Sequence, residues 1–287
     1  MDKKIAFIVN PVSGGRASKK ILREVAQFAE VNTYSIHYTE QKGHAQQLAQ
    51  ELKNNHEILV VVGGDGTINE VAGVVANNSI PMGIIPAGSG NGLAHQLGIP
   101  IKTSEALAIL NRSAKSCDAI EVNNQIIVNV GGLGFDGHVA KLFNEGTNRG
   151  NISYAKLIIK ELLRFKEQDY SLNISNTITE GKAFMIAFAN GSEFGNRFII
   201  NPGANHDNGK LNLVVVRKPP LYKLPALLYA GFKGTLGESK YYKRYLIEEF
   251  ELSCPGASLH RDGEVDSYDS NSPLTIRIIP KALDIIY

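Results

Sequence analysis

The stretch LVVVGGDGTINEVAGVV, Leu59 to Val75, decides the fold of the chain. Four apolar residues typical of a buried strand end at two glycines, and Asp65 and a third glycine follow before a helical pattern begins. A strand that passes through a glycine turn into a helix is one unit of a parallel sheet with crossover helices. The carboxylate inside the turn makes Asp65 the first candidate for a functional residue.

The same unit recurs on both sides of this stretch. Hydrophobic periodicity predicts strands at 3–10, 33–40, 57–62 and 81–86, and helices at 16–30, 44–55 and 67–77. Strands and helices that alternate in this way predict a parallel sheet, in which ligands bind beyond the carboxyl ends of the strands. Three glycine-rich turns, NPVSGG, GGDGT and PAGSGNG, fall at those ends.

The pattern changes beyond about residue 122. Strand-like runs separated by Gly, Asn or Pro turns lie at 124–135, 169–177, 182–191, 197–202, 210–218, 245–253 and 273–280. Helical patterns interrupt them at 151–165 and 220–232. The sequence therefore predicts a second, strand-rich domain built as a β-sandwich.

The composition is that of a soluble globular protein, with 43% hydrophobic and 20% charged residues. A formal net charge of +2 does not favour a nucleic-acid partner. Cys117 and Cys254 lie far apart and form neither a disulfide framework nor a zinc-ligand spacing. We find no signal-peptide pattern and no run of roughly 20 apolar residues that could span a bilayer, so we expect a cytosolic protein.

The glycine-rich turns suit phosphate binding. Such turns let several backbone N–H groups converge on one anion, and a helix that starts behind the turn adds its positive dipole end. Asp65 would repel bound phosphates unless a divalent cation lay between them, and magnesium is held by one or two carboxylates together with substrate phosphates. The alternative is that the turns are only tight connections and that Asp65 caps the following helix.

Other motifs do not fit the classes that they resemble. The Walker form is absent, which excludes a P-loop NTPase. GLGFDG, Gly132 to Gly137, matches the dinucleotide-binding pattern, but it lies in the strand-rich half without the expected acidic residue, so we interpret it as a tight turn. The tripeptide HRD at 260–262 resembles the catalytic loop of protein kinases, but the asparagine expected after it and the lysine of the V-A-I-K strand are missing, so we interpret the match as chance. The seven histidines show no metal-ligand spacing and are expected on the surface or in the core.

Five motifs together resemble the diacylglycerol kinase-like lipid kinases, which share their nucleotide-binding fold with NAD kinases. They are NPVSG at 10–14, GGDGTINEV at 63–71, PAGSGNGLA at 86–94, NVGGLGFD at 129–136 and RDGE at 261–264. The resemblance covers almost the whole chain. It implies an α/β nucleotide-binding domain with a parallel sheet over 1–121 and a C-terminal β-sandwich domain over 122–287, with the active site in the cleft between them. We expect the last residues to return to the first domain.

The resemblance also implies ATP and Mg²⁺ as cofactors and assigns roles to residues. Asp65 would be catalytic and tied to magnesium, directly or through water. Glu264 would be the general base that takes a proton from the lipid hydroxyl. The alternative for Glu264 is a solvated acidic hairpin, since D-G is also a hairpin turn signal. The expected ATP-binding residues are Asn10, Thr39, Gly63, Gly64, Asp65, Gly66, Thr67, Asn69, Gly88, Ser89, Gly90 and Asn91.

Two positions depart from the family's pattern. Gly92 stands where many bacterial members carry Asp, so one carboxylate of the expected magnesium and water network is absent. PAGSGN followed by a small residue is also similar to the sphingosine-kinase version of the motif. Asn208 stands where the family often has the second Asp of a D-D-G turn that holds a structural magnesium, so Asp207 alone is not expected to hold that ion.

The expected activity is ATP- and Mg-dependent transfer of the γ-phosphate to a lipid hydroxyl, with diacylglycerol, which would give phosphatidic acid, as the first candidate. Two alternatives stay open. One is a kinase for a sphingoid base or for another hydroxyl such as that of NAD. The other is a nucleotide-binding regulator without catalysis, which Gly92 makes conceivable.

A lipid kinase of this kind must reach its substrate in a bilayer, which predicts a peripheral protein at the inner face of the membrane. The candidate contact is PLYKLPALLYAGFKG with the following SKYYKRYL, where aromatic and basic residues suit an anionic headgroup layer. The alternative is an amphipathic helix packed on the sandwich with merely solvated charges. A homodimer is left open. The residues concerned are Leu221, Leu224, Leu227, Leu228, Phe232, Lys233, Lys240, Tyr241, Tyr242, Lys243, Arg244 and Tyr245.

Overall fold

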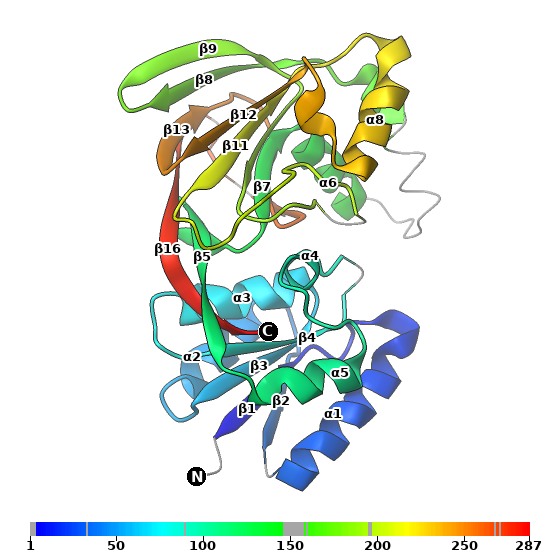
Figure 1. Ribbon diagram of the computed structural model, residues 1–287, viewed down its shortest axis with the longest axis vertical. Coiled ribbons are helices and arrows are strands. Elements are labelled where there is room, and N and C mark those ends of the chain that lie inside the picture. The colour runs from blue at the N-terminus through cyan, green and yellow to red at the C-terminus, as the bar shows by residue number, and fades with distance from the viewer. Residues whose placement is uncertain are drawn as a thin grey trace.

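The computed structural model describes residues 4–287 except 33, 89, 146–157, 159, 195–196, 267 and 270 (Figure 1). Its first domain has a parallel sheet in the order β2-β1-β3-β4 with helices on both sides. The strands are β1 (Ile5–Val9), β2 (Ser35–Tyr38), β3 (Ile58–Gly63) and β4 (Met82–Pro86). The helices are α1 (Ser18–Asn32), α2 (His44–Leu52), α3 (Asp65–Val75), α4 (Gly92–Gln96) and α5 (Thr103–Ala108). Every residue of β1, β3 and β4 is buried, as expected for parallel strands that are covered on both faces.

The second domain packs an antiparallel sheet, β12-β11-β10-β7-β14-β15, between a second sheet and a layer of helices. Its strands and helices are β5 (Ala114–Val122), β6 (Gln125–Ile127), β7 (Val130–Gly134), α6 (Phe135–Glu145), β8 (Gln168–Ile174), β9 (Thr177–Ala183), β10 (Met185–Ala189), β11 (Leu211–Val216), α8 (Leu224–Lys233), β12 (Tyr242–Ile247), β13 (Glu249–Ser253), β14 (Leu259–Arg261), β15 (Glu264–Asp266) and β16 (Leu274–Ile286). Phe188 of the first of these sheets and Phe250 of the other pack in the core between them.

Strand β16 joins the two domains. It pairs with β13 and β5 in the sandwich, and its last residues, Ile285 and Ile286, pair in parallel with Met82 and Gly83 of β4. A bulge between Ile279 and Leu283 bends the strand as it passes from one domain to the other. The parallel sheet of the first domain therefore continues into the outer sheet of the sandwich, and the two domains are held edge to edge (Figure 1).

The fold class is the one predicted, an α/β domain with a parallel sheet and a β-sandwich, but several local predictions need correction. The strands predicted at 124–135 and 182–191 each cover parts of two strands instead of one. Residues 132–137 are not a tight turn, because they form the end of β7 and the start of α6. The run 197–202 is not a strand, because its apolar residues pack beside α8 and it makes one isolated bridge. The strand predicted at 245–253 covers parts of two strands, β12 and β13. Helix α3 begins at Asp65, two residues before the predicted start at residue 67.

The helix predicted at 151–165 lies mostly outside the described residues, although 158 and 160–164 are helical. Throughout the described part of the chain, no helix is both long and apolar enough to cross a bilayer.

Candidate active site

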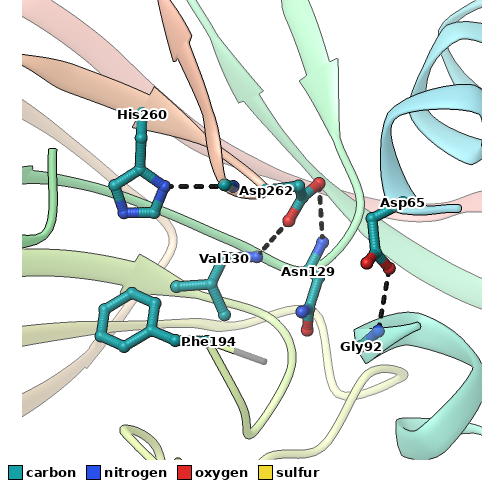
Figure 2. Close-up of a pocket in the computed structure, with 8 residues that line it drawn as sticks. Asp65, Gly92, Asn129, Val130, Phe194, His260 and Asp262 are labelled. Carbon is teal, nitrogen blue, oxygen red and sulfur yellow. Dashed lines mark hydrogen bonds between the residues drawn. The ribbon is translucent and has the colours of Figure 1, made fainter. Parts of the chain in front are cut away.

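A pocket opens where the two domains meet (Figure 2). The first domain contributes the starts of α3 and α4, and the second contributes the start of β7 and the turn between β14 and β15. The residues that line it are Asp65, Gly92, Asn129, Val130, Phe194, His260, Asp262 and Gly263. Parts of the chain that lie far apart in sequence therefore form one site.

Asp65 connects the two glycine turns of the first domain. Gly64, and not Asp65, is the N-cap residue of α3, so the alternative that Asp65 is the capping residue is wrong. The Asp65 carboxylate instead crosses to the start of α4, where its Oδ1 accepts a hydrogen bond of 2.8 Å from the N–H of Gly92 (Figure 2).

The two glycine turns touch each other through their backbones. A Cβ atom added at Gly64 would lie 3.1 Å from the Cα of Gly88, and one added at Gly90 would lie 2.7 Å from the Oδ2 of Asp65. Asn91 holds the second turn closed, because its side chain accepts a hydrogen bond from the N–H of Gly88 and donates one to its carbonyl oxygen. These glycines are thus required for the turns to meet, in addition to any role in phosphate binding.

The other expected ATP-binding residues lie around the same sheet edge. The Asn10 amide donates a hydrogen bond of 3.1 Å to the Thr67 hydroxyl, and Gly63 leaves room for Thr67 because a Cβ there would lie 2.7 Å from that of Thr67. Thr39 is buried and directly follows β2, the strand that pairs with β1. Ser89 lies outside the described residues.

Glu264 extends from the second domain to the glycine turn of the first. A Cβ atom added at Gly66 would lie 2.4 Å from the Oε1 of Glu264. The other carboxylate oxygen is 2.6 Å from the Nζ of Lys42, which lies in the loop before α2. The β14–β15 hairpin does exist, with Asp262 and Gly263 in its turn at positive φ, but its acidic side chain faces the expected nucleotide site.

Asp262 was not among the residues predicted for the site, yet it lies near its centre. It is partly buried, and its carboxylate accepts hydrogen bonds from the backbone N–H groups of Val128, Asn129 and Val130 at 3.1, 3.4 and 2.6 Å. The side-chain amide of Asn69, on α3, lies close enough to lower the pKa of this carboxyl. Asp262 therefore lies where the two domains meet, and the RDGE motif was the signal that could have identified it.

Burial raises the pKa of both Asp65 and Asp262, even though hydrogen bonds from backbone N–H groups act in the opposite direction. The charge of Asp65 raises the pKa of Asp262 further. A carboxyl whose folded-state pKa lies above its unfolded value stabilises the fold only at low pH, and this contribution is lost as the pH rises through the folded-state value. At neutral pH, the two ionised groups therefore reduce the stability of the fold.

Two partly buried carboxyl groups that repel each other fit a divalent cation, which would relieve both the desolvation and the repulsion. Within the described ranges, no three His, Cys, Asp or Glu side chains group around a possible ion position. A metal bound here would take its other ligands from outside these side chains, and the phosphate oxygens of a nucleotide together with water would suit Mg²⁺.

The structure also shows the surroundings of the two departures from the family's pattern. A Cβ at Gly92 would lie 2.4 Å from the Nδ2 of Asn129, so the buried Asn129 amide occupies the space beside that position. At the second departure, the loop around Asn208 is held by Asp118, whose carboxylate accepts hydrogen bonds from the N–H groups of Gly209 and Lys281 at 2.7 and 2.8 Å.

Comparison with known proteins agrees with this architecture. Residues 4–122 match the family described as "Diacylglycerol kinase catalytic domain", and residues 129–287 match "YegS C-terminal NAD kinase beta sandwich-like domain". A diacylglycerol kinase of Mycobacterium tuberculosis is 27% identical and aligns with 99% of this chain and 94% of its own length. A Staphylococcus haemolyticus protein named "Putative lipid kinase SH2167" is 30% identical over 88% of this chain and 85% of its own length.

A crystal structure of a diacylglycerol kinase from Bacillus anthracis has the same fold, with a TM-score of 0.74 over 99% of this chain and 97% of that one. Its identity of 20% supports the fold and nothing finer. Both family matches together span nearly the whole chain, in the order that the five motifs predict. The protein belongs to the diacylglycerol kinase-like lipid kinases, phosphotransferases built on an NAD-kinase-like fold.

Proposed function

We propose that this lipid kinase transfers the γ-phosphate of ATP to the free hydroxyl of diacylglycerol, giving phosphatidic acid and ADP. The observation that carries the proposal is the position of Glu264, whose carboxylate extends from the sandwich domain to Gly66 in the glycine turn of the nucleotide domain. A general base of one domain thus lies beside the expected phosphates of the other. Phosphoryl transfer needs this arrangement of positioned reactants and one group that deprotonates the nucleophile.

In the proposed reaction, Glu264 takes the hydroxyl proton while the hydroxyl oxygen bonds to the γ-phosphorus. The bond between that phosphorus and the β–γ bridging oxygen breaks, and ADP leaves with the bond's electrons. The turns around Gly64 and Gly88 hold the phosphates through their backbone N–H groups. Asp65 and Asp262 would hold Mg²⁺, which when bound neutralises phosphate charge. Lys42, ion-paired with Glu264, keeps a positive charge beside the base.

The test is phosphoryl transfer from radiolabelled ATP, with the purified protein and a panel of acceptors separated by chromatography. The panel contains diacylglycerol, a sphingoid base and NAD, each with Mg²⁺ and with EDTA. The proposal predicts labelled phosphatidic acid, formed with Mg²⁺ and not with EDTA. If labelled sphingoid-base phosphate or NADP forms and phosphatidic acid does not, the acceptor is the sphingoid base or NAD instead of diacylglycerol. The absence of any transfer would favour a non-catalytic regulator.

The proposed partner is an anionic bilayer, reached through the exposed face of α8 and the segment just before it. Tyr222, Tyr229 and Phe232 are 78, 64 and 58% exposed, and the ammonium groups of Lys223 and Lys233 lie over the tyrosine rings at 5.9 and 5.8 Å. Aromatic rings beside lysines suit a negatively charged headgroup layer. Leu224 and Tyr242, which were also expected at the contact, are instead buried in the core of the sandwich domain, so α8 packs on the sandwich with one side as the alternative expected. The proposed contact is therefore limited to the exposed aromatic and basic side chains.

The same surface lies close to the active site through one loop. The ring of Phe198 packs against that of Phe232 at 5.4 Å, and Phe194 in the same loop lines the pocket. Sedimentation with phosphatidylglycerol vesicles tests the contact. The double variant Tyr229→Ser/Phe232→Ser should lose binding, whereas Ile178→Ser, which removes an equally exposed apolar side chain from β9, should keep it. Equal binding by both variants would show that α8 is not the contact.

A further inference from the structure

A third acid, Asp136, lies near the base without touching the expected substrates. The Oδ2 of Asp136, in the first turn of α6, is 2.9 Å from the Nε2 of His260 on β14. Both side chains are buried, with 10 and 4% of their surfaces exposed, and the ring of Phe194 packs against the imidazole at 5.6 Å. Neither residue has a role in the chemistry proposed above.

The neighbours of this pair define which imidazole nitrogen carries the proton. The carboxylate of Asp136 accepts a hydrogen bond from Gly137 N–H through Oδ1 and faces Nε2 of His260 through Oδ2, so Nε2 must be the donor. The other nitrogen, Nδ1, faces the backbone N–H of Gly263 at 3.3 Å, which requires a lone pair there (Figure 2). A neutral imidazole protonated on Nε2 satisfies both contacts.

Gly263 is the turn residue directly before Glu264. The turn is tight, because Asp262 and Gly263 both adopt positive φ values, 47° and 84°, as a two-residue hairpin requires. Strand β15, which starts at Glu264, is three residues long and forms the edge of its sheet. Two side chains therefore hold the turn that presents the base: Asp262 through the backbone of β7, and His260 through Gly263.

The glycines of GLGFDG make room for the pair. A Cβ at Gly132 would lie 2.2 Å from the Oδ2 of Asp136 and 3.2 Å from the Nε2 of His260. A Cβ at Gly137 would lie 1.9 Å from the carbonyl oxygen of Ser258, so this glycine lets α6 approach the segment before β14. Glycine inside a strand normally weakens it, and here Gly132 is explained by the buried hydrogen bond that it accommodates.

We propose that Asp136 and His260 are positioning residues for the general base. Asp136 fixes the tautomer and orientation of His260, and His260 fixes the Gly263 peptide and, through it, the direction of Glu264 toward Gly66. This inference rests on the proposed role of Glu264. These two residues would act indirectly, through Glu264. Their loss would move the base and leave the nucleotide-binding turns in place.

Three substitutions separate the contacts. His260→Gln places an amide near the Nε2 position and keeps a donor to Asp136, but it leaves Gly263 N–H without its acceptor. His260→Asn places an amide oxygen near the Nδ1 position and keeps that acceptor. Asp136→Asn turns one of two accepting oxygens into a donor, so an N–H group must face another N–H group at either Gly137 or His260.

We expect His260→Gln and Asp136→Asn to lower kcat by roughly 10- to 100-fold, because a misplacement of about 1 Å has effects of that size. The KM for ATP should stay within about twofold, and His260→Asn should retain more kcat than His260→Gln. Leu259→Ala, which truncates a buried neighbour on β14, is the control: it should lower Tm and leave kcat largely unchanged at a temperature where the protein is folded.

A double-mutant cycle decides whether the pair acts through Glu264. In a Glu264→Gln background, His260→Gln and Asp136→Asn should lower the residual kcat no further. The same fold-loss in both backgrounds, or a kcat for both variants within twofold of the parent, would overturn the inference. If one variant does not fold, the other carries the test. Full activity of Glu264→Gln alone would instead refute the proposed function.

Discussion

Gly66→Ala tests the contact between the two domains without removing any catalytic group. The added methyl would lie 2.4 Å from the Oε1 of Glu264, whereas an ordinary contact begins at 3.4 Å. Because Glu264 is half-exposed and the clash involves the tip of its side chain, the carboxylate can swing away without disturbing the fold. A displacement of about 1 Å should lower kcat by about 10²-fold.

The stability should change in the opposite direction. Gly66 lies inside α3 and its φ is not positive, so alanine should favour the helix by roughly 0.5–1 kcal/mol and raise Tm by roughly 1–4 °C. Gly73→Ala is a matched control in the same helix, where an added Cβ meets no atom within 4 Å. Steady-state kinetics with diacylglycerol and thermal melting measure both effects. A kcat for Gly66→Ala equal to that of Gly73→Ala would refute the placement of the base.

Three further predictions follow from the same geometry. Asp65→Asn should abolish Mg-dependent transfer yet raise Tm, because it removes a buried charge while an amide oxygen still accepts the hydrogen bond from Gly92; melting and activity measured together check this. Gly64→Val should force the turn away from Gly88 and lower ATP affinity by about tenfold or more in calorimetry, and unchanged affinity would make the turns purely structural. Gly92→Asp should lower Tm without raising kcat, because its Cβ would overlap the Asn129 amide; a higher kcat would show that the carboxylate position can be rebuilt.

The first domain was predicted well because its structure is local. The buried strands β1, β3 and β4 are continuous apolar runs, and each glycine turn lies at a strand end, so the sequence predicted that these turns gather at one edge of the sheet. The contact between Asp65 and the turn at Gly90 came from the structure. The assignment of Glu264 came from the family resemblance. Its sequence neighbours indicate a hairpin, and nothing in them shows which domain the hairpin faces.

The missed residues depend on contacts between distant segments. Asp262 lies in the site because β14 pairs with β7, which brings it to the N–H groups of Val128 and Val130, more than 130 positions away. His260 finds Asp136 through the same pairing. Periodicity reports which face of a strand is apolar, but it does not report the register between strands, and this register turned an ordinary HRD tripeptide into part of the site.

The central claim is that the base on the sandwich domain and the nucleotide turns on the first domain form one phosphoryl-transfer site. Single-turnover transfer from labelled ATP to diacylglycerol, compared between the parent protein and Glu264→Gln with ATP binding measured in parallel, tests it most directly. The account predicts a rate roughly 10²- to 10⁴-fold lower for Glu264→Gln, with the Kd for ATP changed less than about threefold. Equal transfer rates for the two proteins would contradict it.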